Sequence, residues 1–448
     1  MKTVRFFSFF LICSLLLSLF TLPVSAENFS VDAKAALLLE ESTGEILYAK
    51  NIHKELYPAS LTKVMVALLV MEKIDAGKMK LTDTVTASAE AIKENGSTTV
   101  LFEGEEMTVK DLLYCMLVAS ANQAASILAE AVDGSIEAFV KHMNKRASQL
   151  GCKNTHFVNP IGLHDPDHYS TAWDLWLITK EARRHDLFLE ICNTAVYEVP
   201  ATNLSEGRRI HTTNSLLSNW KWVGYLYKNA DGIKTGSTDE AGQCLIASAK
   251  SGSRKLISVV LGAERLTKPD GKTDVKSFSE TIRMFEWGFH NFRRKTLLST
   301  EEAICEVPVA LSKETNYVIA HPAKDLEATV PLDLDPATLK REIKLDAESA
   351  NAPLAAGDKL GTVSLTDGEI TYGTVDLVAL NAVSASRFLR LQYLLKVFFS
   401  HKAVKLILIL LLIGIAILFA VAFSPRNRRR GKRSPVRRRG YRGRGRRF

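Results

Sequence analysis

The sequence predicts a mixed α+β protein that continues into a small all-β domain and ends in a transmembrane helix. From residue 35 to about residue 292, strand-like apolar runs stand at both ends and helical apolar spacing fills the middle. From about residue 301 to residue 380, helical spacing disappears and short segments of alternating polarity take its place. The apolar run 404–423 is long enough, at about 1.5 Å per helical residue, to cross a bilayer core of about 30 Å.

The first elements in the chain are two strands and a buried helix. Ala35–Leu39 and Glu45–Tyr48 have the composition of strands and are separated by the turn residues Ser42-Thr43-Gly44. The stretch Pro58–Met71 then predicts a helix, because Pro58 favours a helix start and residues 64–71 follow with almost no polar break. A helix that is apolar on nearly every side belongs inside a protein.

The same patterns predict the remaining elements. Helical spacing is found over Val109–Val118, Ala124–Val132, Ser135–Leu150, Thr171–His185 with Ser170 as its cap, and Phe278–Phe292. Strands are expected at Leu245–Ser248 and Leu256–Gly262, on either side of a turn at Ser251-Gly252. The segments that predict the β domain are Glu306–Ala310, Tyr317–Ala320, Ala328–Leu332, Glu342–Leu345, Lys359–Leu365 and Glu369–Leu377.

The net charge of +9 is concentrated at the C-terminal end. Residues 424–448 hold 12 Arg, one Lys and no acidic residue. When this tail, Lys2 and Arg5 of the leader, and Lys405 are set aside, residues 27–403 carry a net charge of −7. A mildly acidic body argues against a nucleic-acid-binding surface there.

Both ends of the chain predict export and anchoring. Residues 1–26 combine two basic residues, a Phe/Leu-rich run and a small-x-small end at Ala26, which is typical of a cleaved signal peptide; an uncleaved anchor is the alternative. Basic flanks stay in the cytoplasm, so we expect one membrane span with the body outside and the tail inside. For the arginine-rich tail, contact with anionic lipids is preferred over RNA binding. Residues 387–402 are amphipathic and suit a membrane surface.

The cysteines predict neither a disulfide framework nor a metal site. Those outside the leader are odd in number and scattered along the chain. We expect them to be small buried apolar residues, and no cofactor is expected.

Ser60 and Lys63 are the first candidates for chemistry. Residues three apart share one face of a helix, with Cβ atoms roughly 5–6 Å apart. A serine hydroxyl is a poor nucleophile until a neighbouring base takes its proton, and a lysine can be that base if burial lowers its pKa. The pair alone is a weak signal, because an N-cap serine beside a solvated lysine has the same spacing.

Two further short motifs strengthen the signal. Ser60-x-x-Lys63 is followed by Ser120-x-Asn122 and then by Lys234-Thr235-Gly236 at a strand edge, where the glycine lets a substrate backbone approach. All three motifs in this order, in an exported chain, are a strong signal for a serine acyl-transfer site.

On these residues the sequence resembles the serine penicillin-recognising enzymes, and among them the low-molecular-mass D-alanyl-D-alanine carboxypeptidases. The resemblance covers about Val31–Phe292. It is carried by Tyr57-Pro58-Ala59-Ser60-Leu61-Thr62-Lys63, Asn159-Pro160-x-Gly162-Leu163, His168-Tyr169-Ser170-Thr171-Ala172-x-Asp174-Leu175 and Asp231-Gly232-x-Lys234-Thr235-Gly236. It implies a penicillin-binding/β-lactamase-like domain, with an antiparallel sheet flanked by helices and a helical subdomain, and an active site between the two.

The resemblance also implies catalytic roles. Ser60 would attack the carbonyl between the two terminal D-alanines of a peptidoglycan stem peptide, and Lys63 would be the base for acylation. Ser120 would relay a proton to the leaving D-alanine, while Lys234 keeps this network electropositive.

The implied substrate-binding residues come from all three motifs. Asn122 would hydrogen-bond the amide of the peptide, and Thr235 with Lys234 would hold the terminal carboxylate. The backbone N–H groups of Ser60 and Ser237 would form the oxyanion hole, with Gly236 leaving room beside them. Water would then hydrolyse the acyl-enzyme, and penicillin and other β-lactam antibiotics would acylate the same serine.

Two departures from the family pattern stand out. Gln123 follows Asn122 where many relatives carry Asp, which weakens any brace that acts through charge. The apolar run 404–423 is long enough to span a membrane, whereas the anchor of relatives is often an amphipathic helix.

Two alternatives to a carboxypeptidase stay open, a β-lactamase-like hydrolase and a non-catalytic cell-wall scaffold. His164 and His168 are expected to be loop hydrogen-bonding residues, and the sequence gives no indication of the oligomeric state.

The expected division of the chain follows from these assignments. It comprises a signal peptide (1–26), a D,D-peptidase catalytic domain (27–297), a C-terminal β domain (298–382), a juxtamembrane amphipathic segment (383–403), a transmembrane helix (404–423) and a basic cytoplasmic tail (424–448).

Overall fold

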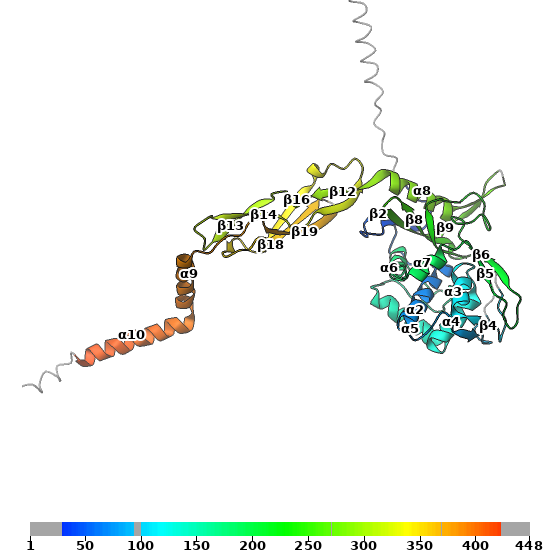
Figure 1. Cartoon of the computed structure of the whole chain (residues 1–448), viewed down its shortest axis with the longest axis horizontal. Coiled ribbons are helices and arrows are strands. Elements are labelled where there is room, and N and C mark those ends of the chain that lie inside the picture. The colour runs from blue at the N-terminus through cyan, green and yellow to red at the C-terminus, as the bar shows by residue number, and fades with distance from the viewer. Residues whose placement is uncertain (1–28, 94–99, 270, 369, 423–448) are drawn as a thin grey trace, which may run out of the picture. The chain divides into compact units, whose positions relative to one another are not determined.

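The computed structural model describes residues 29–93, 100–269, 271–368 and 370–422, which divide into two compact units (Figure 1). The larger unit runs to Lys295 and includes Ala328–Leu334, and the smaller unit holds the rest. Strands β12 (Phe292–Leu298) and β15 (Leu326–Pro331) contribute residues to both. The expected signal peptide and basic tail lie outside the described residues.

The larger unit is built on a five-stranded antiparallel sheet in the order β2-β1-β9-β8-β7. Its strands come from the two ends of the unit, and β7 lies at one edge. The strands expected early in the chain and around residues 245–262 are confirmed, although the later two are longer than expected. The bounds are β1 (Ala35–Glu40), β2 (Ile46–Lys50), β7 (Ala230–Thr238), β8 (Gly242–Ser251) and β9 (Arg254–Ala263).

Both faces of this sheet are buried against helices. Every residue of β1 is buried, and its side chains alternate between two apolar cores. Leu37 and Leu39 belong to the core on one face, and Ala36 and Leu38 belong to the core on the other. This alternation follows from the period of two along a strand.

The helices between β2 and β7 form the first core, and α8 (Lys276–Asn291) covers the opposite face. Residues 64–71 of α2 are all buried, which confirms the expectation of an interior helix. These helices are α2 (Lys63–Asp75), α3 (Val109–Leu117), α4 (Asn122–Asp133), α5 (Ile136–Gln149), α6 (Ala172–Ala182) and α7 (Asp186–Cys192). Short two-stranded sheets pair β3 (Thr84–Thr86) with β4 (Glu106–Thr108), β5 (Val196–Val199) with β6 (Arg208–His211), and β10 (Arg265–Thr267) with β11 (Thr273–Val275).

The expected cap of α6 was wrong by one residue. The helix begins at Ala172, and the hydroxyl of Thr171 accepts a hydrogen bond from the Asp174 N–H at 3.0 Å. Ser170 has another role, because its backbone N–H donates to the Leu56 carbonyl and its hydroxyl lies 2.9 Å from that of Thr155. Both residues can cap a helix, so tertiary pairing decides between them.

The smaller unit confirms the expected C-terminal β domain and apolar helix. Its six-stranded sheet has the order β16-β18-β19-β14-β13-β17. The helix α10 (Lys402–Ala422) is long and apolar enough to cross a membrane, with a mean hydropathy of 3.1 over residues 402–421. The other elements are β13 (Cys305–Ala310), β14 (Tyr317–Pro322), β16 (Lys340–Leu345), β17 (Ala350–Asn351), β18 (Lys359–Thr366), β19 (Thr371–Ala379) and α9 (Arg387–Ser400).

Candidate active site

Ser60 lies in a single 3-10 turn, η2 (Ala59–Thr62), that leads directly into α2. Ala59 has a positive φ of 50°, which is unusual for a residue with a side chain and marks a backbone held by its surroundings. One of those surroundings is Gly162, where an added Cβ would lie only 1.9 Å from the Ala59 carbonyl oxygen. Only glycine fits there, so the 159–163 loop can press against the turn that carries Ser60.

Lys63 is fully buried below Ser60, and its amine is surrounded by oxygens. The Nζ atom lies 2.9 Å from Ser60 Oγ, 2.8 Å from Asn122 Oδ1 and 2.7 Å from the Ile161 carbonyl oxygen. Burial lowers the pKa of Lys63 well below its usual value, and the charge of Lys234 lowers it further. A lysine in this state is suited to receive a proton.

Ser120 and Asn122 are placed by the connection between α3 and α4. Ser120 has a φ of 61°, and Asn122 is the first residue of α4. The next residue, Gln123, is buried and bonds in two directions: its Oε1 accepts from the Leu101 N–H at 2.7 Å, and its Nε2 donates to the Ile92 carbonyl at 3.1 Å. The brace at this position therefore works through a neutral amide rather than through a charge.

Lys234 reaches the site from the edge strand β7. Its buried Nζ donates to Ser120 Oγ and to the Thr235 carbonyl oxygen, both at 2.9 Å. Burial lowers the pKa of Lys234 to about 7. At Gly236, an added Cβ would lie 2.9 Å from the Pro58 carbonyl oxygen and 3.1 Å from the Ser60 nitrogen. β7 can thus run directly beside the backbone of Ser60.

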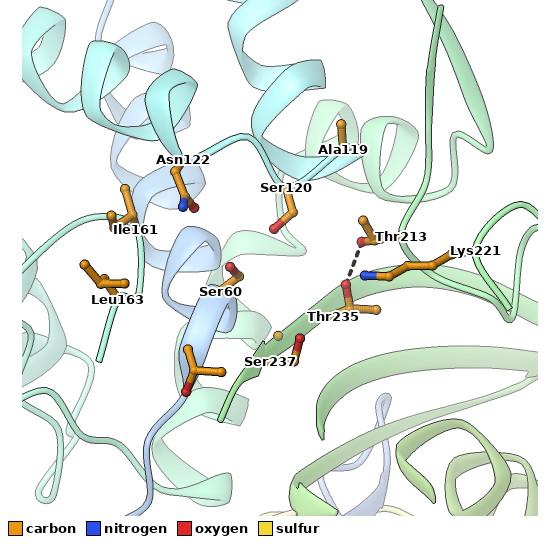
Figure 2. Close-up of a pocket in the computed structure, with 13 residues that line it drawn as sticks. Ser60, Ala119, Ser120, Asn122, Ile161, Leu163, Thr213, Lys221, Thr235 and Ser237 are labelled. Atoms are coloured by element: carbon orange, nitrogen blue, oxygen red, sulfur yellow. Dashed lines mark hydrogen bonds between the residues drawn. The ribbon is translucent and has the colours of Figure 1, made fainter. Parts of the chain in front are cut away.

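These elements enclose a cavity of about 240 Å³ (Figure 2). Six of the eight residues expected from the sequence line it, and Lys63 and Lys234 lie beneath its surface and bond to lining hydroxyls. The lining is Ser60, Ala119, Ser120, Asn122, Ile161, Gly162, Leu163, Thr213, Lys221, Thr235, Gly236, Ser237 and Thr238. Thr213 and Lys221 were not anticipated as site groups, because they come from a loop without a motif. The Ile161 carbonyl was not anticipated either, because it is a backbone group at the variable position of Asn159-Pro160-x-Gly162.

His168 is a structural residue, as expected. Its Nδ1 accepts a hydrogen bond from the Val158 N–H, and its Nε2 lies 2.8 Å from the Thr62 hydroxyl, which itself donates to the Ala59 carbonyl. Burial is the main cause that lowers the pKa of His168 to about 4, so the ring is neutral at physiological pH. Through the Thr62 hydroxyl, His168 holds the turn that carries Ser60 in place.

Comparison with known families decides which family the chain belongs to. Residues 22–265 match the family model for D-alanyl-D-alanine carboxypeptidase, and residues 292–385 match the model for the penicillin-binding protein 5 C-terminal domain. The chain belongs to the D-alanyl-D-alanine carboxypeptidase family. The resemblance inferred from the sequence motifs is thereby confirmed.

Curated relatives and solved structures agree with the family match. The chain is 36% identical over 341 residues to D-alanyl-D-alanine carboxypeptidase DacF of Bacillus subtilis, covering 76% of this chain and 83% of the relative. It is 30% identical to DacA of Escherichia coli, covering 83% and 89% of the two chains. Penicillin binding protein 5 from Haemophilus influenzae has 31% identity and a TM-score of 0.61, over 80% of this chain and 98% of that chain.

Family membership establishes the activity. This member is a serine-type D-Ala-D-Ala carboxypeptidase, a penicillin-binding protein that acts on peptidoglycan. The expected α+β fold of the penicillin-binding type with a C-terminal β-rich domain is confirmed as well. Its one apolar C-terminal helix among the described residues is consistent with membrane anchoring.

Proposed function

We propose that Ser60 is the nucleophile of the carboxypeptidase and that neutral Lys63 is its base. The observation that supports this is the set of partners around Lys63 Nζ. A neutral amine has two N–H groups and one lone pair. The carbonyl oxygens of Ile161 and Asn122 accept the two N–H groups, so the lone pair is directed at the Ser60 hydroxyl, 2.9 Å away.

The reaction begins when Ser60 Oγ attacks the carbonyl carbon of the penultimate D-alanine. The hydroxyl proton passes to Lys63 Nζ as the new C–O bond forms. The C–N bond to the terminal D-alanine then breaks, and the departing nitrogen must gain a proton. Ser120 relays to that nitrogen the proton that Lys63 took from Ser60, and its contact with Lys234 keeps the relay in a positive environment.

Backbone and side-chain groups of the same cavity would hold the substrate. The N–H groups of Ser60 and Ser237 form the oxyanion hole, which the close approach of β7 to the Ser60 turn supports. Asn122 bonds the peptide amide. Thr235 and Lys234 face the terminal carboxylate from β7. Water completes the cycle by hydrolysing the ester on Ser60.

The test uses a fluorescent penicillin, which reports acylation and its lifetime in one experiment. We expect a long-lived adduct on the wild-type protein and none on Ser60→Ala, with D-Ala release from a Lys-D-Ala-D-Ala peptide also lost. Melting curves of both proteins check that the variant is folded. Covalent labelling that persists in Ser60→Ala would rule out Ser60 as the acylated residue. An adduct that turns over within seconds would favour the β-lactamase alternative, and no adduct on the wild type would favour the scaffold.

We also propose the orientation of the protein in the membrane and its domain division. The catalytic domain (27–297) and the β domain (298–382) lie outside the cell membrane, residues 404–423 span it, and the basic tail (424–448) lies in the cytoplasm. The length of α10 and the 13 basic residues that follow it support this arrangement. Protease added to intact spheroplasts should shed the body and leave the tail protected, and digestion of the tail from outside would contradict the orientation.

A further inference from the structure

Lys221 is the one charged side chain among the described residues that line the catalytic cavity. It belongs to the irregular segment between β6 and β7, outside all three sequence motifs. The other two lysines of the site, Lys63 and Lys234, are buried beneath the cavity wall rather than part of it. A ligand in the cavity therefore meets the ammonium of Lys221 first.

The amine of Lys221 is directed at a pair of threonine hydroxyls. Figure 2 shows the side chain reaching from one side of the cavity toward Thr213 and Thr235, whose hydroxyl oxygens lie 2.6 Å apart. Within the described ranges no acidic side chain forms an ion pair with Lys221. One unneutralised cation beside two hydroxyl groups is a suitable arrangement for a carboxylate, which accepts hydrogen bonds only.

Lys234 is poorly placed to bind a carboxylate by itself, because it is buried beneath the cavity wall. Two of its N–H groups are already given to Ser120 Oγ and to the Thr235 carbonyl oxygen. Burial also lowers the pKa of Lys234 to about 7, because desolvation disfavours the charged form of the amine. The terminal carboxylate of a peptide is fully ionised at neutral pH. A carboxylate that relied on Lys234 alone would face a buried amine with two of its N–H groups already in use.

We propose that Lys221 binds the terminal carboxylate of the peptide, together with the Thr213 and Thr235 hydroxyls, and thereby selects substrates with a free C-terminus. Lys234 then supports the same carboxylate from β7 and also serves the proton relay at Ser120. This inference rests on the proposed function of Ser60 and assigns a specificity-determining residue to the same site.

The surroundings of Lys221 fit an anion. Although Lys221 is an exposed residue, partial desolvation of its amine lowers its pKa, and Arg265 lowers that pKa further through repulsion between the two cations. The guanidinium of Arg265 lies 6.0 Å from the centre of the Trp222 ring. An incoming carboxylate would offset the repulsion between the two cations, so the site gains from the negative charge of its ligand.

The test compares Lys221→Gln with Lys221→Arg and with a matched control, Lys250→Gln. Lys250 is an exposed lysine of β8 outside the cavity, so its substitution removes the same charge from the protein without touching the site. The substrates are diacetyl-Lys-D-Ala-D-Ala and the same peptide with a C-terminal carboxamide. Benzylpenicillin and its methyl ester form a second pair for acylation.

Lys221→Gln should lower kcat/KM for the free acid by about ten- to a hundredfold, since a charge-assisted hydrogen bond is lost. The loss should appear mainly in KM, because the bond is present before and during the reaction. The carboxamide and the methyl ester should react at the wild-type rate. Lys221→Arg should stay within a few fold of wild type, and Lys250→Gln should be unchanged with every substrate.

Equal losses with the acid and the carboxamide would show that Lys221 acts through the structure of the loop, and would overturn the proposal. An unchanged free-acid rate in Lys221→Gln would overturn it too. Both outcomes leave the role of Ser60 intact as long as Ser60→Ala abolishes labelling. Labelling that survives in Ser60→Ala would instead refute the proposed function itself.

Discussion

Gly236→Ala tests whether β7 must lie directly against the Ser60 turn. The new methyl group would lie 2.9 Å from the Pro58 carbonyl oxygen and 3.1 Å from the nitrogens of Ser60 and Leu61. All three are backbone atoms, so no flexible side chain can move aside. An ordinary contact needs about 3.4 Å or more, and β7 must therefore shift by roughly 0.3–0.5 Å.

The expected cost is larger for catalysis than for stability. A misplacement of about 1 Å costs on the order of a hundredfold in rate, so a shift of this size should lower the acylation rate by roughly four- to tenfold. Overpacking costs about 1–3 kcal/mol, which corresponds to a fall in Tm of roughly 2–10 °C for a domain of this size. The rate is measured as the second-order rate constant of acylation by benzylpenicillin, and the Tm by calorimetry.

Gly207→Ala is the matched control for this experiment. An added Cβ at Gly207 would make its nearest contact at 3.4 Å, with the Val199 carbonyl oxygen, and its backbone needs no positive φ. We expect wild-type acylation and stability for this variant. If Gly236→Ala also acylated at the wild-type rate, the close approach of β7 to Ser60 would not be needed for the reaction.

Three further predictions follow from the site and the anchor. Lys234→Gln should slow acylation by about one to two decades. The charge of Lys234 lowers the pKa of Lys63, so the substitution should raise that pKa and move the acid limb of the acylation pH profile to higher pH. An acid limb at the wild-type position would show that the charge of Lys234 does not affect Lys63. Gln123→Glu should lower the free energy of unfolding by about 1–3 kcal/mol, measured by urea unfolding, because a carboxylate cannot donate to the Ile92 carbonyl. Unchanged stability would show that this hydrogen bond does not hold the loop in place. A chain that ends after Ser384 should be soluble and active, because the cut falls before α9. If this truncated protein sedimented with membranes, the β domain would carry a membrane-binding surface of its own.

The sequence predicted the motif-bearing part of the site better than the loops around it. Ser60, Lys63 and Lys234 could be found because the proposed nucleophile, base and cation are side chains within short sequence motifs. The Ile161 carbonyl could not, since a backbone oxygen leaves no signature in the residue type. Lys221 looks like any loop lysine, and only the fold brings it to the Thr213–Thr235 pair. The presence of Gln123 in place of the family's Asp was visible in the sequence. Its two hydrogen bonds were not, because no local sequence pattern determines where the backbone groups of Ile92 and Leu101 lie.

The order of strands in the central sheet has a consequence for how the protein matures. β1 pairs with β9, so Ala35 must find Leu261 across more than two hundred residues of intervening chain. During synthesis β1 and β2 therefore emerge long before β9, and the helices that follow them lack most of the sheet on which they pack. Ser60 meets Gly236 only once β7 joins that sheet through β8. The proposed active site is thus completed late in assembly, and a chain interrupted before β9 would carry the Ser-x-x-Lys motif without β7 held beside it.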